Sequence, residues 1–131
     1  MELKRWKFTI SVLWLIWTVA FLVTLLTGLL EPGALEVVNG GELYGVRITP
    51  GLILATTIMM LEPLVMAFLS LTLKDSISRW ANVVVGSFYT ALSLFDWLSA
   101  PMQSAYGIIL FIFKIAASVL IVYYAWRSPK L

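Results

Sequence analysis

The apolar stretch at residues 49–73 constrains this chain more than any other feature, because it contains a single charged side chain, Glu62. A stretch of this length and composition predicts a helix that crosses a membrane, since about 20 apolar residues span the hydrocarbon core. Glu62 lies near the middle and is followed by Pro63, which cannot donate a backbone hydrogen bond. A carboxylate at that depth favours the interior of a bundle. We therefore predict a kink at Pro63, although proline alone is also tolerated in membrane helices.

Composition places the whole chain in the same class. Of its residues 61% are hydrophobic and 12% are charged, whereas a soluble domain is roughly a quarter charged. The net charge of +2 is small and the basic residues lie at segment ends, so we predict no nucleic-acid partner. The chain contains no cysteine and no histidine, which excludes disulfides and zinc sites built on those side chains. Calcium-loop spacings and nucleotide-binding motifs are also missing, and we predict no metal site and no cofactor.

Four apolar segments predict an all-α protein, a bundle of four transmembrane helices in one domain. The domain comprises residues 1–131, and the predicted spans are residues 8–30, 49–73, 76–99 and 101–126. Thr49 suits the N-cap of the second span and Pro50 suits its first turn. Residues 31–48 form the one sizeable loop. This loop is compatible with a short helix after Pro32, which we favour, or with a hairpin that turns at residues 39–40.

Basic residues predict the orientation of this bundle. Seven of them lie beside segment ends that face one side: Lys4, Arg5, Lys7, Lys74, Arg79, Arg127 and Lys130. The loop on the other side contains only Arg47. Under the positive-inside rule, both termini are cytoplasmic and residues 31–48 are extracellular. Tryptophan and tyrosine residues gather near both predicted boundaries, as in the aromatic belt of membrane proteins. We expect a multi-pass protein of the cell membrane.

Three of the predicted spans place a polar side chain at about the same depth. Glu62 lies near the middle of the second span, Tyr89 near the middle of the third and Lys114 near the middle of the fourth. A buried acid and a buried base are expected to pair, because either charge alone costs more free energy. We therefore predict a buried polar layer of these three side chains. Glu62 and Lys114 would meet across the bundle directly, or through Tyr89 or water.

Polar and small residues also recur along one face of the third span. The members of this stripe, at steps of four, three, four and three, are Asn82, Gly86, Tyr89, Ser93 and Asp96. In a membrane such a stripe is expected to face the bundle interior. Interhelical hydrogen bonds and a close approach at Gly86 are the interpretation that we favour. The alternative hypothesis is that Ser93 and Asp96 connect the central layer to the outer surface, with Asn82 doing the same toward the inside.

Several short motifs indicate a relationship to a known family. They are Ser11-Val12-Leu13-Trp14, Thr49-Pro50, Leu71-Thr72-Leu73-Lys74, Arg79-Trp80-Ala81-Asn82, Gly86-Ser87-Phe88-Tyr89-Thr90 and Tyr124-Ala125-Trp126-Arg127-Ser128-Pro129. With these motifs the chain resembles a family of small prokaryotic four-span integral membrane proteins catalogued as a domain of unknown function. The resemblance extends over nearly the whole chain. It implies the four-span fold and a prokaryotic cell membrane, and it brings no catalytic or binding residue.

Two functional hypotheses follow for this membrane protein. The favoured one is a non-catalytic scaffold or accessory membrane subunit, in which the Glu62–Lys114 pair fixes the register of the helices. The alternative is a small proton- or cation-coupled transporter or channel-like protein, which would act as an oligomer because the chain is short. An intramembrane enzyme is the least favoured class, since without cysteine or histidine it would depend on Glu62, Tyr89, Asp96 and Lys114. We predict no catalytic residue. The expected partners are the lipid bilayer and a second copy or another membrane protein.

Overall fold

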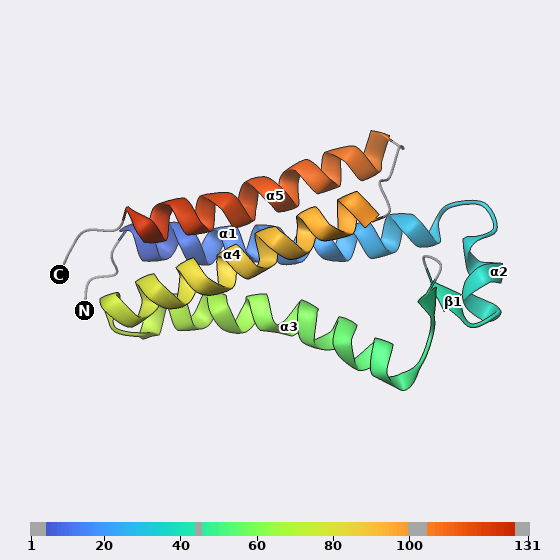
Figure 1. Cartoon of the computed structure of the whole chain (residues 1–131), viewed down its shortest axis with the longest axis horizontal. Helices are drawn as coiled ribbons and strands as arrows, with labels where there is room; N and C mark the ends of the chain where they lie inside the picture. Colours follow the sequence, from blue (N-terminus) through green and yellow to red (C-terminus); the bar gives the residue numbers. More distant parts are fainter. Residues whose placement is uncertain (1–4, 44–45, 100–104, 128–131) are drawn as a thin grey trace.

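The computed structural model describes residues 5–43, 46–99 and 105–127. Four long helices dominate the described residues (Figure 1): α1 (Arg5–Leu29), α3 (Pro50–Thr72), α4 (Asp75–Ser99) and α5 (Ala105–Trp126). The segment between α1 and α3 contains α2 (Ala34–Asn39) and two short strands, β1 (Glu42–Leu43) and β2 (Val46–Arg47). Each of the four long helices lies within or close to a segment that the sequence predicts to be a span. The all-helical class is therefore confirmed.

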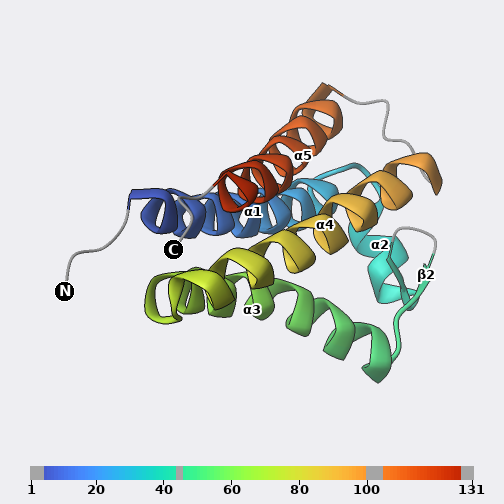
Figure 2. The same ribbon diagram turned by 60° about the vertical axis from the view of Figure 1, so that its left-hand side comes forward.

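Helix α1 is the central element of the bundle. It packs against α3 on one side and α5 on the other, and α4 packs closely on α5. Helices α3 and α5 lie on opposite sides of α1 in two views (Figures 1 and 2). Helices α3 and α4 are joined by a tight turn and diverge as they leave it (Figure 2). The start of α1 and the end of α5 lie at the same end of the bundle as this turn (Figure 1).

The hydrophobic core lies mainly toward this end of the bundle. Its buried members are Ile10, Leu13, Trp14, Trp17, Met66, Ala67, Tyr89, Ala117, Ile121 and Ala125. On α1 the core residues follow steps of three and four, which places them on one face. The large aromatic side chains of α1 fill the space where α3, α4 and α5 converge. Packing of this kind, rather than exclusion from water, drives helix association in lipid.

The closest approach between α4 and α5 occurs at Gly86. A Cβ atom at this position would lie 2.8 Å from Val122 Cγ2 and 3.2 Å from Ile121 Cγ2. Both neighbours are β-branched side chains with little freedom to rotate away in a helix. Only glycine therefore fits this crossing without displacing its neighbours. The predicted close approach at Gly86 is confirmed.

Helix α3 packs along only half of its length. Its buried residues are Pro63, Met66, Ala67 and Ser70, all in the C-terminal half. In the N-terminal half large apolar side chains are exposed, including Ile53 and Leu54 at 58% and 60%. The helix continues through Pro63 without interruption, and the kink expected there stays a prediction. Its start follows the sequence signal, because the Thr49 hydroxyl accepts a hydrogen bond from Leu52 N at 3.1 Å.

The segment between α1 and α3 contains the short helix that we favoured. Helix α2 ends at Gly40, whose N–H donates to Glu36 O at 2.9 Å. The hairpin that we considered at residues 39–40 is wrong, because residue 39 belongs to α2. A small antiparallel ladder forms further along, where Glu42 is opposite Arg47. It follows Gly41, whose φ of 92° lies in the left-handed region that glycine adopts without strain.

Three described helices are long and apolar enough to cross a membrane: α1, α3 and α5. Helix α4 has 25 residues, as many as α1, but it contains more polar residues. Its polar side chains begin at Asp75 in the first turn and include the stripe that the sequence predicts. The structure therefore contains several helices of membrane-spanning length. Whether α4 can also cross a membrane depends on whether its polar face lies inside the bundle.

Candidate functional site

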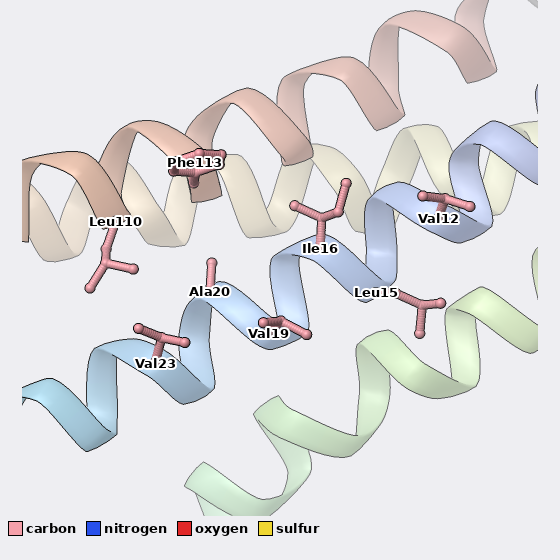
Figure 3. A pocket seen from close by; sticks show the side chains of 8 residues that line it. All are labelled: Val12, Leu15, Ile16, Val19, Ala20, Val23, Leu110 and Phe113. Carbon is pink, nitrogen blue, oxygen red and sulfur yellow. The ribbon is translucent and has the colours of Figure 1, made fainter.

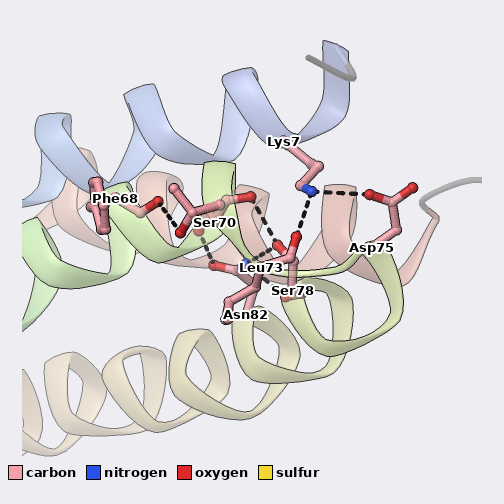
Figure 4. A network of polar contacts seen from close by, with 8 residues as sticks. Lys7, Phe68, Ser70, Leu73, Asp75, Ser78 and Asn82 are labelled. Carbon is pink, nitrogen blue, oxygen red and sulfur yellow. Dashed lines mark hydrogen bonds and ion pairs between the residues drawn. The ribbon is translucent and has the colours of Figure 1, made fainter. Parts of the chain in front are cut away.

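The most extensive polar cluster joins α1, α3 and α4 near the α3–α4 turn (Figure 4). At its centre is Asn82, which is fully buried. Its Oδ1 atom accepts hydrogen bonds from Trp14 Nε1 at 2.7 Å and from Ser70 Oγ at 3.1 Å. Its Nδ2 atom donates to Ser78 O at 2.7 Å. One amide side chain thus connects three helices. We call Lys7, Ser11, Trp14, Ser70, Asp75, Ser78 and Asn82 the turn network.

Lys7 extends the turn network to the end of α3. Its Nζ atom donates to Leu73 O at 2.7 Å and forms an ion pair with Asp75 Oδ1 at 2.9 Å (Figure 4). The carbonyl groups in the last turn of a helix have no intrahelical partner. Lys7 therefore satisfies one of them, and its side chain is only 8% exposed. Two serines add further links, since Ser78 Oγ donates to Ser70 O and Ser11 Oγ donates to Ala67 O.

The sequence predicts only part of this network. Asn82 was expected to face the bundle interior, and the structure places it there. Lys7 was assigned only a role in orientation, because its acceptor Leu73 lies 66 residues further along the chain. Trp14 was assigned no polar role. A tryptophan and an asparagine on different helices carry no spacing signal that would reveal their hydrogen bond.

Tyr89 lies at the centre of a second group of side chains, about two helical turns along α4 from Asn82. Its ring packs edge-on with Trp14 and Trp17, with centroids 5.4 Å and 4.8 Å apart. Its hydroxyl interacts with the Glu62 carboxylate from α3. The structure therefore brings two members of the predicted polar layer together, and indole rings from α1 pack against Tyr89.

Two polar atoms in this aromatic region are buried and have no hydrogen-bond partner among the described residues. They are Glu62 Oε2 and Trp17 Nε1. A buried acceptor or donor that makes no hydrogen bond costs about 1–3 kcal/mol of stability. Glu62 lies on the inward face of α3, because Pro63 and Met66 beside it are buried. The carboxylate is thus directed into the bundle, but the described residues provide no cation for it.

Lys114 is the third member of the predicted layer, and the structure places it elsewhere. Its ammonium group interacts with Asp96 and lies 6.0 Å from the centre of the Phe21 ring. Among the residues that the structure describes, Lys114 forms no ion pair with Glu62. The physical reason is the order of the helices, because α1 lies between α3 and α5 (Figures 1 and 2). The expectation that acid and base would meet at equal depth is therefore not met in this arrangement.

The polar stripe of α4 faces the interior over most of its length. Asn82, Gly86, Tyr89 and Ser93 are buried. Asp96 is exposed, one turn beyond Ser93, at the end where α4 diverges from α3. Interhelical packing thus explains the stripe up to Ser93. The connection from the central layer to the surface through Ser93 and Asp96 stays a prediction.

The geometry of these residues indicates a class of protein. The described residues form a helical bundle with membrane-length helices, a satisfied polar network and a central carboxylate. Within the same ranges, no group of three or more His, Cys, Asp or Glu side chains is placed to hold a metal ion. The polar groups described above include oxygen acceptors, the ammonium groups of Lys7 and Lys114, and the side chains of tryptophan and tyrosine.

The chain belongs to a family of unknown function, DUF6326, whose family model matches residues 2–130. This confirms that the resemblance extends over nearly the whole chain. No curated protein and no solved structure matches the chain significantly. Family membership brings no residue roles, so any function must be argued from the geometry above.

Proposed function

We propose that the chain is a multi-pass protein of the prokaryotic cell membrane with four spans and cytoplasmic termini. The support for α4 as the fourth span is its inverted amphipathic pattern. Its polar residues Ser78 and Asn82 are fully buried, whereas Val84, Phe88 and Phe95 are 58–69% exposed. In water this arrangement would be unfavourable. In lipid it is favourable, because the polar side chains lie inside the bundle and the apolar side chains face the hydrocarbon. The excess of lysine and arginine around the α3–α4 turn supports the orientation.

Within this membrane class, the favoured function is that of a non-catalytic scaffold or accessory subunit. The observation that carries it is the turn network, whose side chains satisfy one another within the chain. Asn82 alone makes hydrogen bonds to Trp14, Ser70 and Ser78. Groups used in this way fix helix positions and are not free to bind substrate. The exposed apolar surface of α3 and α4 then provides area for a second copy or another membrane protein.

The scaffold function is tested by cross-linking in native membranes followed by purification in a mild detergent. The expected result is a stable complex of defined stoichiometry that contains the chain and at least one further copy or partner. Reconstituted into liposomes, the purified chain should produce no ion or proton flux above that of empty vesicles. A chain that stays monomeric in the membrane and in detergent would contradict the scaffold function.

One observation favours the second candidate, a small proton- or cation-coupled transporter that acts as an oligomer. Within the described ranges, Glu62 Oε2 is buried with no hydrogen-bond partner, and Lys114 forms no ion pair with Glu62. An ionisable group inside a membrane without a counter-charge is a candidate for cation or proton coupling. This function requires flux in liposomes that Glu62→Gln abolishes. Glu36→Gln is the matched control, because Glu36 is exposed in α2, and it should leave any flux unchanged.

A further inference from the structure

Grooves run between helices on the outside of the bundle, and two of them, both formed by described residues, differ in chemistry. The first lies between α1 and α5 and has a volume of about 400 Å³ (Figure 3). Its lining is entirely apolar: Val12, Leu15, Ile16, Val19, Ala20, Val23, Leu110 and Phe113. The second, which we call the α4–α5 groove, has a volume of about 560 Å³. It is lined by Ser87, Thr90, Ala91, Leu94, Val119, Val122, Tyr123, Trp126 and Arg127.

The α4–α5 groove is apolar along its length and basic at one end. Leu94 and Val119 belong to the apolar part, and Arg127 follows the last residue of α5. The groove covers eight residues of α5 between Val119 and Arg127, which corresponds to about 12 Å of helix. One leaflet of the hydrocarbon core is about 15 Å thick, half of about 30 Å. The groove therefore has the length of a single leaflet, with a cation at its outer boundary.

A second arginine supports the basic end of the groove. Arg79 Nη2 donates to Trp126 O at 3.0 Å, and its guanidinium lies 5.7 Å from the centre of the Trp126 ring. Arg79 Nε is buried and makes no hydrogen bond to the residues that the structure describes. The Arg127 guanidinium lies 5.6 Å from the centre of the Tyr123 ring. Among the described residues, neither arginine forms an ion pair with a carboxylate. This end of the groove thus has the exposed Arg127 guanidinium available to an anion, with the Arg79 guanidinium bound to Trp126 nearby.

We propose that the α4–α5 groove binds one phospholipid with an anionic headgroup. The lipid phosphate is bound by Arg127, with Arg79 beside it, and an acyl chain lies along Leu94, Val119 and Val122. Guanidinium groups bind phosphate through charge-assisted hydrogen bonds, which are stronger than neutral ones. Tyr123 and Trp126 lie at headgroup level, where aromatic side chains prefer to be. The proposal rests on the proposed membrane topology, in which this end of the bundle faces the cytoplasmic leaflet.

The chemistry of the groove favours a lipid over a second copy of the chain. Two copies in the same membrane orientation that met through this groove would place both Arg127 side chains at the same depth. The like charges would repel each other in a region of reduced dielectric constant. The groove between α1 and α5 provides the internal comparison, because it has no charged side chain to select a headgroup. We expect headgroup selectivity only at the α4–α5 groove.

The test uses the purified full chain in a neutral detergent, with phosphatidylglycerol and phosphatidylcholine of identical acyl chains as probes. Native mass spectrometry counts the bound lipid, and a thermal unfolding midpoint measured by circular dichroism reports its effect. The expected result is one retained phosphatidylglycerol, a raised midpoint, and about tenfold weaker retention of phosphatidylcholine. Arg127→Gln should weaken phosphatidylglycerol binding by about tenfold, as expected for a lost charge-assisted hydrogen bond. Arg127→Lys, which keeps the charge, should recover part of it.

Two further variants separate a site from general surface charge. Arg5→Gln is the matched control, because Arg5 is exposed at the same end of the bundle and lies outside the groove. It removes the same charge and should change binding by less than twofold. Ala91→Phe fills the groove without altering any charge, and it should abolish the selective binding. Ala91 is exposed to the groove, so this variant is expected to keep the wild-type helicity.

Three outcomes would overturn the proposal. They are equal retention of both lipids, an equal loss in Arg5→Gln and Arg127→Gln, and undiminished binding in Ala91→Phe. A dimer that Ala91→Phe dissociates would identify a second copy as the occupant instead. The experiment is made in detergent and needs no partner protein and no flux. Loss of lipid selectivity would therefore leave the cross-linking result for the scaffold function intact, and failure of that function would leave the lipid site intact.

Discussion

The two halves of α3 have similar composition but different surroundings. In the C-terminal half, Met66, Ala67 and Ser70 are buried against α1 and α4. In the N-terminal half, Ile53 and Leu54 are exposed and the helix diverges from its neighbours (Figures 1 and 2). Apolar side chains are equally abundant in both halves. Hydrophobicity therefore does not decide which half packs.

The difference between the halves lies in the polar groups near them. The C-terminal half is joined to α1 and α4 by hydrogen bonds of Ser70, Asn82 and Lys7. In the N-terminal half, the side-chain hydrogen bonds that the structure describes are local: Thr49 caps the helix and Thr57 Oγ1 donates to Ile53 O. In hydrocarbon a helix gains little by exchanging lipid for another apolar helix, so polar bonds and close packing determine where helices meet. The following variants test this comparison, in order of decreasing loss of stability.

Loss of the Asn82 amide should have the largest effect. Asn82→Ala removes the acceptor of Trp14 Nε1 and leaves that donor buried. We expect a loss of about 3 kcal/mol in the free energy of unfolding, since one buried group becomes unpaired and further hydrogen bonds disappear. Unfolding in mixed micelles, followed by circular dichroism, measures it. Asn39→Ala in exposed α2 is the control and should change stability by less than about 0.5 kcal/mol. Equal effects in both variants would contradict the role of the turn network.

A pair of glycine substitutions compares the packed and open regions directly. Gly86→Ala places a Cβ 2.8 Å from Val122 Cγ2, and we expect a loss of about 2 kcal/mol from overpacking. Gly51→Ala meets no atom closer than Thr49 Oγ1 at 3.7 Å, so it should be neutral or stabilise by up to about 1 kcal/mol. Thermal unfolding of both variants makes the comparison. Adding Val122→Ala to Gly86→Ala should restore most of the lost stability, and a failure to do so would place the strain elsewhere.

The Lys7–Asp75 pair should show a measurable coupling energy. The variants are Lys7→Met, Asp75→Asn and both together. We expect a coupling of about 1–2 kcal/mol, more than an exposed pair gives, because the two side chains are only 8% and 17% exposed. The unfolding free energies of the wild-type chain, the two single variants and the double variant give the coupling energy. Lys74→Met, which removes an exposed charge beside the same turn, should have almost no effect. A coupling near zero would mean that the turn network stabilises the fold through its neutral hydrogen bonds alone.

The smallest effect is expected for Glu62 and Lys114. Glu62→Gln and Lys114→Met should be additive within about 0.5 kcal/mol, because the two side chains belong to helices on opposite sides of α1. The same double-mutant cycle in micelles measures it. A coupling above about 1 kcal/mol would mean that the two charges meet in the membrane, and it would restore the predicted central layer.

The outcome for this layer explains what the sequence could and could not predict. Depth in a membrane follows from position along a helix, so Glu62, Tyr89 and Lys114 were assigned to one level by counting residues. The order of helices around the bundle does not follow from spacing, because it depends on which faces pack. Tyr89 and Glu62 meet because α3 and α4 share a turn, whereas Lys114 lies on α5 beyond α1. The prediction concerned the depth of the side chains and contained no information on their arrangement around the bundle axis.

The local signals in the sequence were more reliable. Thr49 and Pro50 predicted the start of α3, and the hydroxyl of Thr49 makes the expected bond. The regular stripe on α4 predicted its buried face up to Ser93. These features depend on neighbours three or four residues away, which periodicity can reveal. The contact between Lys7 and Leu73 depends on residues far apart in sequence, and no pattern along the chain indicates it.

The Lys7–Leu73 contact has a consequence for how the protein is made. Lys7 leaves the ribosome 66 residues before its acceptor. In the proposed membrane topology, α1 would therefore be inserted with an ammonium group that has no acceptor within its own helix. The group can be buried only after α3 has been inserted and the chain has turned back. The burial of Lys7 at the start of α1 therefore depends on the completion of α3. If the proposed topology holds, we expect a truncated chain that stops before residue 73 to have a mobile amino-terminal segment, accessible to labelling reagents from the side on which α1 begins.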